Sequence, residues 1–231
     1  IETIGLFALI SILISLSLMP VTLANKATPG YEQVENLPFK KLIKTSPLAV
    51  MCVFGCGFIN AAMLTIGPVY AQTLGFDLSN IAWLMALFIL GCAIVPLATG
   101  WLSDRMDRRK VIIGLCFLGV FFSAAVSLNS GLAMLIGFFV GGCSTSIYSI
   151  GVAMMNDRLK TSQMTSATAT LILINGIGAC MSPILLGSMM DIFGIQIFFG
   201  SFALLFIGVF AFGLFRNFTG PEVSVEDQGD F

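Results

Sequence analysis

The sequence has very few charged residues and no histidine. Of its 231 residues, 10% are charged and 57% are hydrophobic. A soluble domain carries roughly 25% charged residues because its surface must be solvated. The composition therefore excludes soluble enzymes, nucleic-acid-binding domains and disordered chains. We expect an integral membrane protein with the lipid bilayer as its surroundings and with no nucleic-acid partner.

Groups for catalysis or metal binding are also scarce. Histidine is the commonest metal ligand and the commonest general base, and the chain has none. Cys52 and Cys56 lie four residues apart on one helix face, but no histidine or carboxylate lies near them in the sequence. We interpret all six cysteines as small, buried apolar residues. The sequence thus predicts no enzyme, no metal site and no cofactor.

Long apolar segments predict seven transmembrane helices. A bilayer core requires about 20 mostly apolar residues in a helix. The segments that meet this requirement are 4–24, 47–72, 80–102, 111–128, 132–155, 164–190 and 192–215. The predicted fold class is an all-α membrane protein with seven transmembrane helices.

Lys and Arg residues fall in every second connector between these segments. The connectors that hold all 11 of them are 25–46, 103–110, 156–163 and the tail that begins at Arg216. The connectors near 73–79, 129–131 and 191 hold none. Because Lys and Arg accumulate in cytoplasmic loops, residue 1 is expected to begin outside, and the 25–46 loop and the C-terminus are expected to be cytoplasmic.

One long connector divides the chain. We expect 1–24 to be a single helix, 25–46 a cytoplasmic linker and 47–217 a six-helix unit. The acidic segment 218–231 has the composition of a disordered tail. Because the first apolar segment begins almost at residue 1, we expect the chain to be the later part of a longer protein.

Two of the predicted helices share the pattern G-x4-P-x3-G-x3-D. It begins at Gly91 and again at Gly178, which is 87 residues later. The first copy is expected to run inward and the second outward. Three helices repeated in opposite orientation are the plan of many secondary transporters.

The proline and the second glycine of each copy are candidates for bending the helix. Pro96 and Pro183 lack an N–H, so each leaves a backbone carbonyl unpaired and lets the helix bend. Gly100 and Gly187 follow four residues later, where a glycine lets a neighbouring helix approach. Such helices could rock against their neighbours.

The connector after 80–102 carries a motif. It reads Gly100-Trp101-Leu102-Ser103-Asp104-Arg105-Met106-Asp107-Arg108-Arg109-Lys110. This resembles the signature loop of the major facilitator superfamily, G-x-L-x-D-R-x-G-R-R, with Asp107 where the family usually has glycine. A long basic loop before it and four helices after it match the second copy of that loop, between helices 8 and 9. The resemblance implies helices 6 to 12 of a twelve-helix transporter, so that 1–24 would end the N-terminal half and 47–217 would form the C-terminal half.

Three further segments are similar to the YcaD-like branch of this superfamily. They are Gly67-Pro68-Val69-Tyr70, Asn80-Ile81-Ala82-Trp83-Leu84-Met85-Ala86 and Ile147-Tyr148-Ser149-Ile150-Gly151-Val152-Ala153. The resemblance implies a multi-pass protein of the bacterial inner (plasma) membrane, monomeric when complete with its N-terminal half. It also implies alternating access with a small-molecule substrate, and it leaves coupling to protons open.

The charges of the motif are candidates for a conformational latch. Asp104 ends its helix, where the helix dipole disfavours a carboxylate, and an arginine can hold a carboxylate in bidentate fashion. The resemblance implies that Gly100, Asp104, Arg105, Arg108 and Arg109 latch the cytoplasmic ends of the two halves. The alternative is that these charges are solvated and only set the topology.

No ionisable side chain lies in the middle of a predicted span, so the pathway candidates are neutral. They are Asn60, Ser144, Tyr148, Thr168 and Asn175. Thr168 and Asn175 lie seven residues apart on one helix face. A buried asparagine in lipid must find a partner or face water, so Asn60 and Asn175 either line a pathway or join two helices.

The sequence therefore favours a secondary transporter of a small neutral or amphipathic solute. A seven-span receptor without transport activity is the alternative, because the predicted count is seven with the N-terminus outside. A membrane enzyme would lack histidine, paired carboxylates and a metal-ligand cluster.

Overall fold

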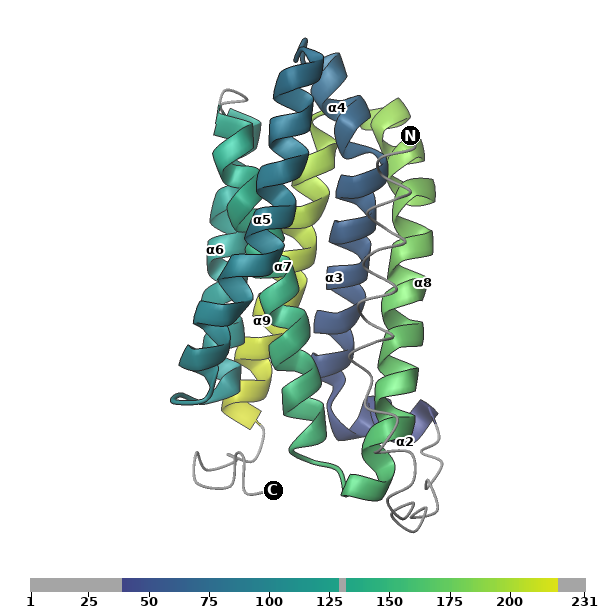
Figure 1. Cartoon of the computed structure of the whole chain (residues 1–231). Coiled ribbons are helices and arrows are strands. Elements are labelled where there is room, and N and C mark those ends of the chain that lie inside the picture. The colour runs from purple at the N-terminus through teal and green to yellow at the C-terminus, as the bar shows by residue number, and fades with distance from the viewer. Residues whose placement is uncertain (1–38, 129–131, 220–231) are drawn as a thin grey trace, which may run out of the picture. The chain divides into compact units, whose positions relative to one another are not determined.

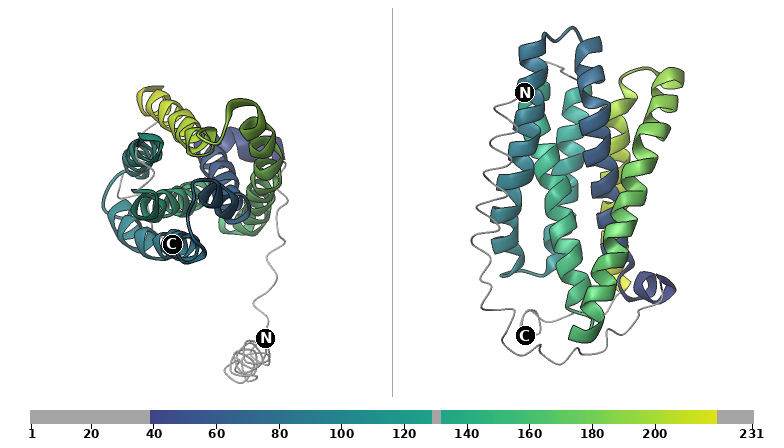
Figure 2. Two further views of the ribbon diagram at one scale, coloured as in Figure 1. Left: turned by 90° about the horizontal axis from the view of Figure 1, so that it is seen from above. Right: turned by 45° about the vertical axis from the view of Figure 1, so that its right-hand side comes forward.

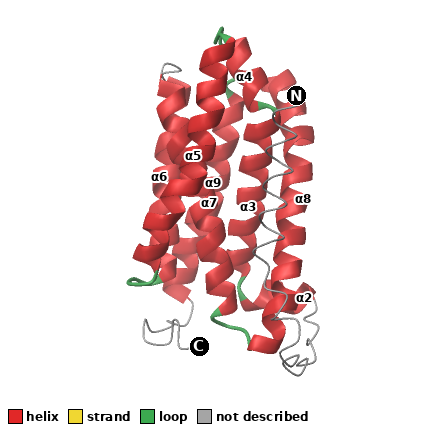
Figure 3. Cartoon of the chain, in the orientation of Figure 1, coloured by secondary structure: helices red, strands yellow, loops and turns green. Residues whose placement is uncertain are grey.

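A computed structural model describes residues 39–128 and 132–219, which lie in one structural unit, Asn36–Phe231. The regular elements of this described part are helices joined by short loops (Figure 3). The predicted span 4–24, most of the 25–46 linker and the acidic tail from residue 220 onward lie outside the described residues.

Six of the described helices are long and apolar enough to cross a membrane. The helices are α2 (Phe39–Thr45), α3 (Pro47–Thr65), α4 (Gly67–Thr73), α5 (Leu78–Ser103), α6 (Arg108–Leu128), α7 (Ala133–Asn156), α8 (Thr161–Phe193) and α9 (Ile197–Thr219). These six, α3 and α5 to α9, correspond to the last six predicted spans. The all-α membrane fold class is thus confirmed.

Most helix ends shift by a few residues from the predicted spans, and two features differ more. The single helix expected over 47–72 ends at Thr65, and α4 begins at Gly67. Pro68 explains the break, because it has no N–H to donate to the carbonyl four residues earlier and restricts the residue before it. The second difference is α2, which forms a short helix within the predicted linker, directly before Ser46 and Pro47.

Consecutive long helices run in opposite directions along the bundle (Figure 1). The end with α2 also carries the connectors 104–107 and 157–160, and we call it the basic end (Figure 1). The connectors 74–77 and 194–196 lie at the opposite end (Figure 1). Gly75 and Gly194 both adopt φ of 82° in these two turns, a conformation that favours glycine.

The helix pairs fit the inverted repeat predicted from the sequence. The closest neighbours are α5 with α7, α3 with α8, and α6 with α9. An offset of 87 residues places α3 on α7, α5 on α8 and α6 on α9. With this offset, the contact between α5 and α7 corresponds to the contact between α8 and α3. The contact between α6 and α9 corresponds to itself with the two helices exchanged. Seen from above, α3 and α7 lie at the centre of the bundle (Figure 2).

Close helix contact occurs at the first glycine of each repeated pattern. A Cβ at Gly91 would collide with the backbone carbonyl oxygen of Phe138 in α7, and one at Gly178 would collide with that of Phe54 in α3. The repeat therefore brings equivalent glycines into equivalent helix pairs.

The second glycine of each pattern does not have the role expected from the sequence. A Cβ at Gly100 or Gly187 would meet open space within the described part of the chain. The expected approach of a neighbouring helix thus falls at Gly91 and Gly178 instead.

Both prolines lie inside continuous helices, Pro96 in α5 and Pro183 in α8. Pro183 leaves the carbonyl of Ala179 without its usual N–H partner. The hydroxyl of Ser182 donates to that carbonyl at 3.2 Å. The expected bend at these prolines stays a prediction.

Candidate functional site

The basic end contains an ion pair between Arg108 and Asp157. The Arg108 Nε and Asp157 Oδ2 atoms are 2.8 Å apart, and the two side chains are only 13% and 9% exposed. Arg108 begins α6 and Asp157 directly follows α7, so the pair joins these two helices at the basic end.

This pairing corrects the expectation that Asp104 would hold an arginine of its own motif. Asp104 is exposed at the end of α5 and makes no ion pair with another described residue. Arg105 lies over the Trp101 ring, with its guanidinium carbon 3.7 Å from the ring centroid. Trp101 lies in the last turn of α5 and Arg105 in the connector that follows, so the Arg105 side chain runs back along this helix.

Asp107, which replaces the usual glycine of the motif, caps α6. Its Oδ1 accepts a hydrogen bond from the backbone N–H of Arg109 at 2.9 Å. An aspartate before a helix satisfies N–H groups that the first turn leaves unpaired. The departure from the family pattern thus has a structural role at the start of α6.

Two further arginines tie helix ends together. Arg109 is 5% exposed, and its Nη1 donates to the carbonyl of Arg216 at 3.4 Å, which links α6 to α9. Arg158 Nη1 donates to the carbonyl of Thr45 at 3.1 Å, which links the α7–α8 connector to the end of α2. The basic end is therefore a network of charged contacts across α2, α6, α7 and α9.

Burial dominates the electrostatics of this network. It is the largest influence on the pKa of the Asp157 carboxyl, which is raised; the negative charge of Asp104 raises it further, and Arg108 and Arg158 lower it. Burial also lowers the pKa of Arg158, and the nearby positive charges of Arg109 and Arg216 lower that pKa further. The buried charges at this end are therefore held at an electrostatic cost, which a change of conformation can release.

The predicted pathway asparagines both join helices. Ser144 Oγ in α7 donates to Asn60 Oδ1 in α3 at 3.0 Å, and Asn60 Nδ2 lies 3.4 Å from Cys56 Sγ. Asn175 Nδ2 in α8 donates to the carbonyl of Val53 in α3 at 3.0 Å. Both asparagines remain partly exposed. Interhelical bonding is thus present, and a role in lining the pathway stays a prediction.

The other two pathway candidates, Tyr148 and Thr168, belong to α7 and α8. Tyr148 is partly buried against the core, and Thr168 is partly exposed on α8. Sequence reasoning missed another polar contact, in which Thr99 Oγ1 in α5 donates to Ser146 Oγ in α7 at 2.8 Å. The run Ser144-Thr145-Ser146 was its signal, because adjacent residues point from one helix toward different neighbours.

Sequence reasoning also missed Asp157. It is the single acidic residue of connector 156–163, beside Arg158 and Lys160. A lone carboxylate among basic residues, at the same end as the motif, could have marked it as a partner for an arginine. That Asp157 pairs with Arg108 depends on the packing of α6 against α7, which a sequence does not reveal.

The chain is similar in sequence to a known protein family and to individual transporters. The family model described as Major Facilitator Superfamily matches residues 50–229. The uncharacterized MFS-type transporter YfkF of Bacillus subtilis (strain 168) is 29% identical over 151 residues, which cover 63% of this chain and 38% of that protein. The 4-hydroxybenzoate transporter PcaK of Pseudomonas aeruginosa is 28% identical over 149 residues, covering 60% of this chain and 32% of that protein.

Two further proteins are similar to the chain, one from the YcaD-like branch and one with a similar fold. The uncharacterized MFS-type transporter YcaD of Escherichia fergusonii is 20% identical over 185 residues, covering 79% of this chain and 48% of that protein. The crystal structure of the POT family transporter PepTSo matches with a TM-score of 0.66 and 16% identity, covering 81% of this chain and 40% of that chain. The chain thus spans less than half the length of these relatives. With the repeat, the motif loop and the matched family model in agreement, the chain belongs to the Major Facilitator Superfamily.

Proposed function

We propose that the chain is the C-terminal part of a secondary transporter that moves a small neutral or amphipathic solute by alternating access. Membership of the superfamily and the transporter names of the relatives support membrane transport. The observation that carries the mechanism is the pairing of α5 with α7 and of α8 with α3, each through an equivalent glycine. Two equivalent, closely packed pairs of opposite direction provide the parts of a rocking motion.

The basic end is proposed to be cytoplasmic. It holds α2 and the connectors 104–107 and 157–160, with which most of the Lys and Arg residues of the described part are associated. We further propose that Gly100, Asp104, Arg105, Arg108 and Arg109 act there as a latch, with Asp157 as the partner that the sequence did not predict. The exposed carboxylate of Asp104 is then available to the other half of the transporter.

The proposed solute is neutral or amphipathic because the polar groups found between the spans are amides and hydroxyls. The PcaK relative is named for 4-hydroxybenzoate, an aromatic carboxylate. A substrate of that kind is the second candidate, and its carboxylate would need a cation from outside the described spans. No observation favours the receptor alternative.

The test uses the full-length protein in proteoliposomes. Uptake of 4-hydroxybenzoate is compared with uptake of a neutral phenol of similar size, before and after Asp104→Asn. The substitution keeps the size of the side chain and removes its charge, and about 1.4 kcal/mol shifts a balanced two-state equilibrium tenfold. We expect uptake to fall about tenfold while equilibrium binding changes little.

Three results would count against parts of this proposal. Loss of binding in a folded Asp104→Asn protein would make Asp104 a substrate ligand. Unchanged uptake and binding would mean that the motif charges only set topology. Uptake restricted to the carboxylate would replace the neutral substrate class by an anionic one.

A further inference from the structure

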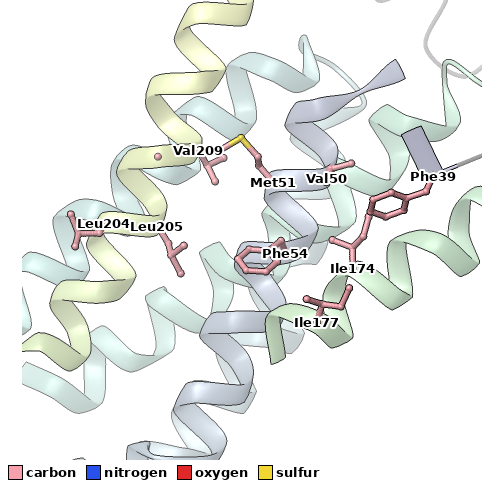
Figure 4. A pocket seen from close by; sticks show the side chains of 10 residues that line it. Phe39, Val50, Met51, Phe54, Ile174, Ile177, Leu204, Leu205 and Val209 are labelled. Atoms are coloured by element: carbon pink, nitrogen blue, oxygen red, sulfur yellow. The ribbon is translucent and has the colours of Figure 1, made fainter. Parts of the chain in front are cut away.

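An apolar groove lies between α3, α8 and α9, next to α2 (Figure 4). Its volume is about 440 Å³, and all of the residues that line it are apolar. Phe39 comes from α2, Met51 and Phe54 from α3, Ile177 from α8 and Leu204 from α9 (Figure 4). The groove is within the range of small-molecule sites, about 300–1,000 Å³, but such sites usually add a few polar groups that orient the ligand. A lining without polar groups fits a hydrocarbon chain.

The groove coincides with a departure from the inverted repeat. α6 packs closely along α7, whereas its repeat counterpart α9 makes few contacts with α3. Gly208 of α9 lines the groove, and a Cβ there would meet open space. The separation of α9 from α3 therefore leaves a space that side chains do not fill.

The helix α2 brings positive charge to one end of this groove. Phe39 lines the groove and is 49% exposed, while Lys40, Lys41 and Lys44 on the same helix are exposed. Leu42 is fully buried and anchors α2 against the bundle. The bond from Arg158 to the Thr45 carbonyl holds the end of α2. The lysines thus lie on a helix that borders the groove at the basic end.

We propose that this groove binds the acyl chain of an anionic phospholipid, with the headgroup phosphate at the lysines of α2. Hydrocarbon is the chemistry that an entirely apolar lining accepts, and a row of exposed lysines at the membrane interface attracts anionic headgroups. A transported solute is the less favoured occupant because the groove offers it no polar anchor. The assignment does not depend on the proposed transport function.

Native mass spectrometry of the full-length protein tests the assignment. The protein is titrated with phosphatidylglycerol or phosphatidylcholine of identical acyl chains. We expect phosphatidylglycerol to bind about fivefold more tightly or better, as one or more lysines at the interface would provide. Replacing Lys40, Lys41 and Lys44 together by glutamine should remove this preference without abolishing binding of either lipid.

A second substitution tests the groove itself. Gly208→Leu places a side chain in the open space of the groove, and it should weaken the binding of both lipids at least fivefold. Gly114→Leu in α6 is the matched control, because Gly114 also faces open space but lies outside the groove. This control should bind both lipids as the unmodified protein does.

Three outcomes would overturn the assignment. Equal binding of the two lipids by the unmodified protein would show that the lysines select no headgroup. Unchanged binding in Gly208→Leu would show that the lipid sits elsewhere, or that another part of the full-length chain covers the groove. If Gly208→Leu weakened the binding of a transported solute and left lipid binding intact, the groove would belong to the substrate pathway.

Discussion

Replacing Gly91 or Gly178 by alanine is expected to destabilise the folded protein and to abolish most of its transport. At both positions the added Cβ would collide with a backbone carbonyl oxygen of the neighbouring helix, Phe138 in α7 or Phe54 in α3. A backbone cannot yield as the end of a side chain can, so the helices must separate. Overpacking of this kind costs about 1–3 kcal/mol. The thermal unfolding midpoint and the uptake rate of the full-length protein measure the effect.

Gly176→Ala is the matched control for these substitutions. Gly176 lies in α8, two residues from Gly178, and a Cβ there would meet open space. Alanine is also the better helix former by about 1 kcal/mol, so this variant should be as stable as the unmodified protein or slightly more stable. If Gly178→Ala and Gly176→Ala behave alike, the close contact between α3 and α8 is wrong.

The two members of the buried ion pair are expected to respond unequally to substitution. Arg108→Gln leaves the Asp157 carboxylate nearly buried without its partner, and we expect it to cost about 1–3 kcal/mol at neutral pH. Asp157→Asn removes the negative charge, and burial is the largest influence on the pKa of that carboxyl. The amide oxygen of the asparagine can still accept a hydrogen bond from Arg108. We expect that variant to change stability by less than about 1 kcal/mol. The double variant should return close to the unmodified protein.

The same pair has a defined pH dependence. Burial raises the pKa of Asp157 in the folded protein. A carboxyl with a raised folded pKa favours the fold fully below its unfolded pKa, and this contribution is lost as the pH rises through the folded pKa. The destabilisation by Arg108→Gln should therefore shrink on acidification through that pKa, as thermal unfolding across a pH series would show. Equal destabilisation by both single variants at every pH would contradict this account.

Local sequence properties predicted much of the fold. Apolar length located six described helices, since crossing a membrane is a demand that each segment meets by itself. The break at Ile66 was missed because the apolar run around it predicts one continuous helix. Pro68 interrupts that helix, since it has no backbone N–H to donate. The short helix α2 was missed because it is held by its packing through Leu42 and by Arg158, which lies more than a hundred residues away.

The candidate site was predicted by residue type better than by partner. The motif correctly directed attention to the charged connector after α5, but Arg108 pairs with Asp157 of another connector. Asn60 and Asn175 were recognised as groups that need partners, and the structure supplies Ser144 and the Val53 carbonyl. Partners depend on which helix faces are in contact, and neither periodicity nor composition determines that in a chain that is apolar on nearly all sides.

The central claim is that the two ends of the bundle open alternately. Thr65 is exposed at the end of α3 away from α2, and Ser149 is exposed on α7 toward the basic end. A single cysteine is introduced at each position in the full-length protein, with Cys92 and Cys180 replaced by alanine because they are the two cysteines of this chain that are not buried.

Labelling of these cysteines by a membrane-impermeant maleimide is the most direct measurement. It is carried out from the outside for position 65 and from the cytoplasmic side for position 149, with and without Arg108→Gln. Alternating access predicts that the substitution opens the basic end, so that labelling at 149 rises up to about tenfold for a shift of 1.4 kcal/mol while labelling at 65 falls. Labelling that rises at both positions, or changes at neither, would contradict the account.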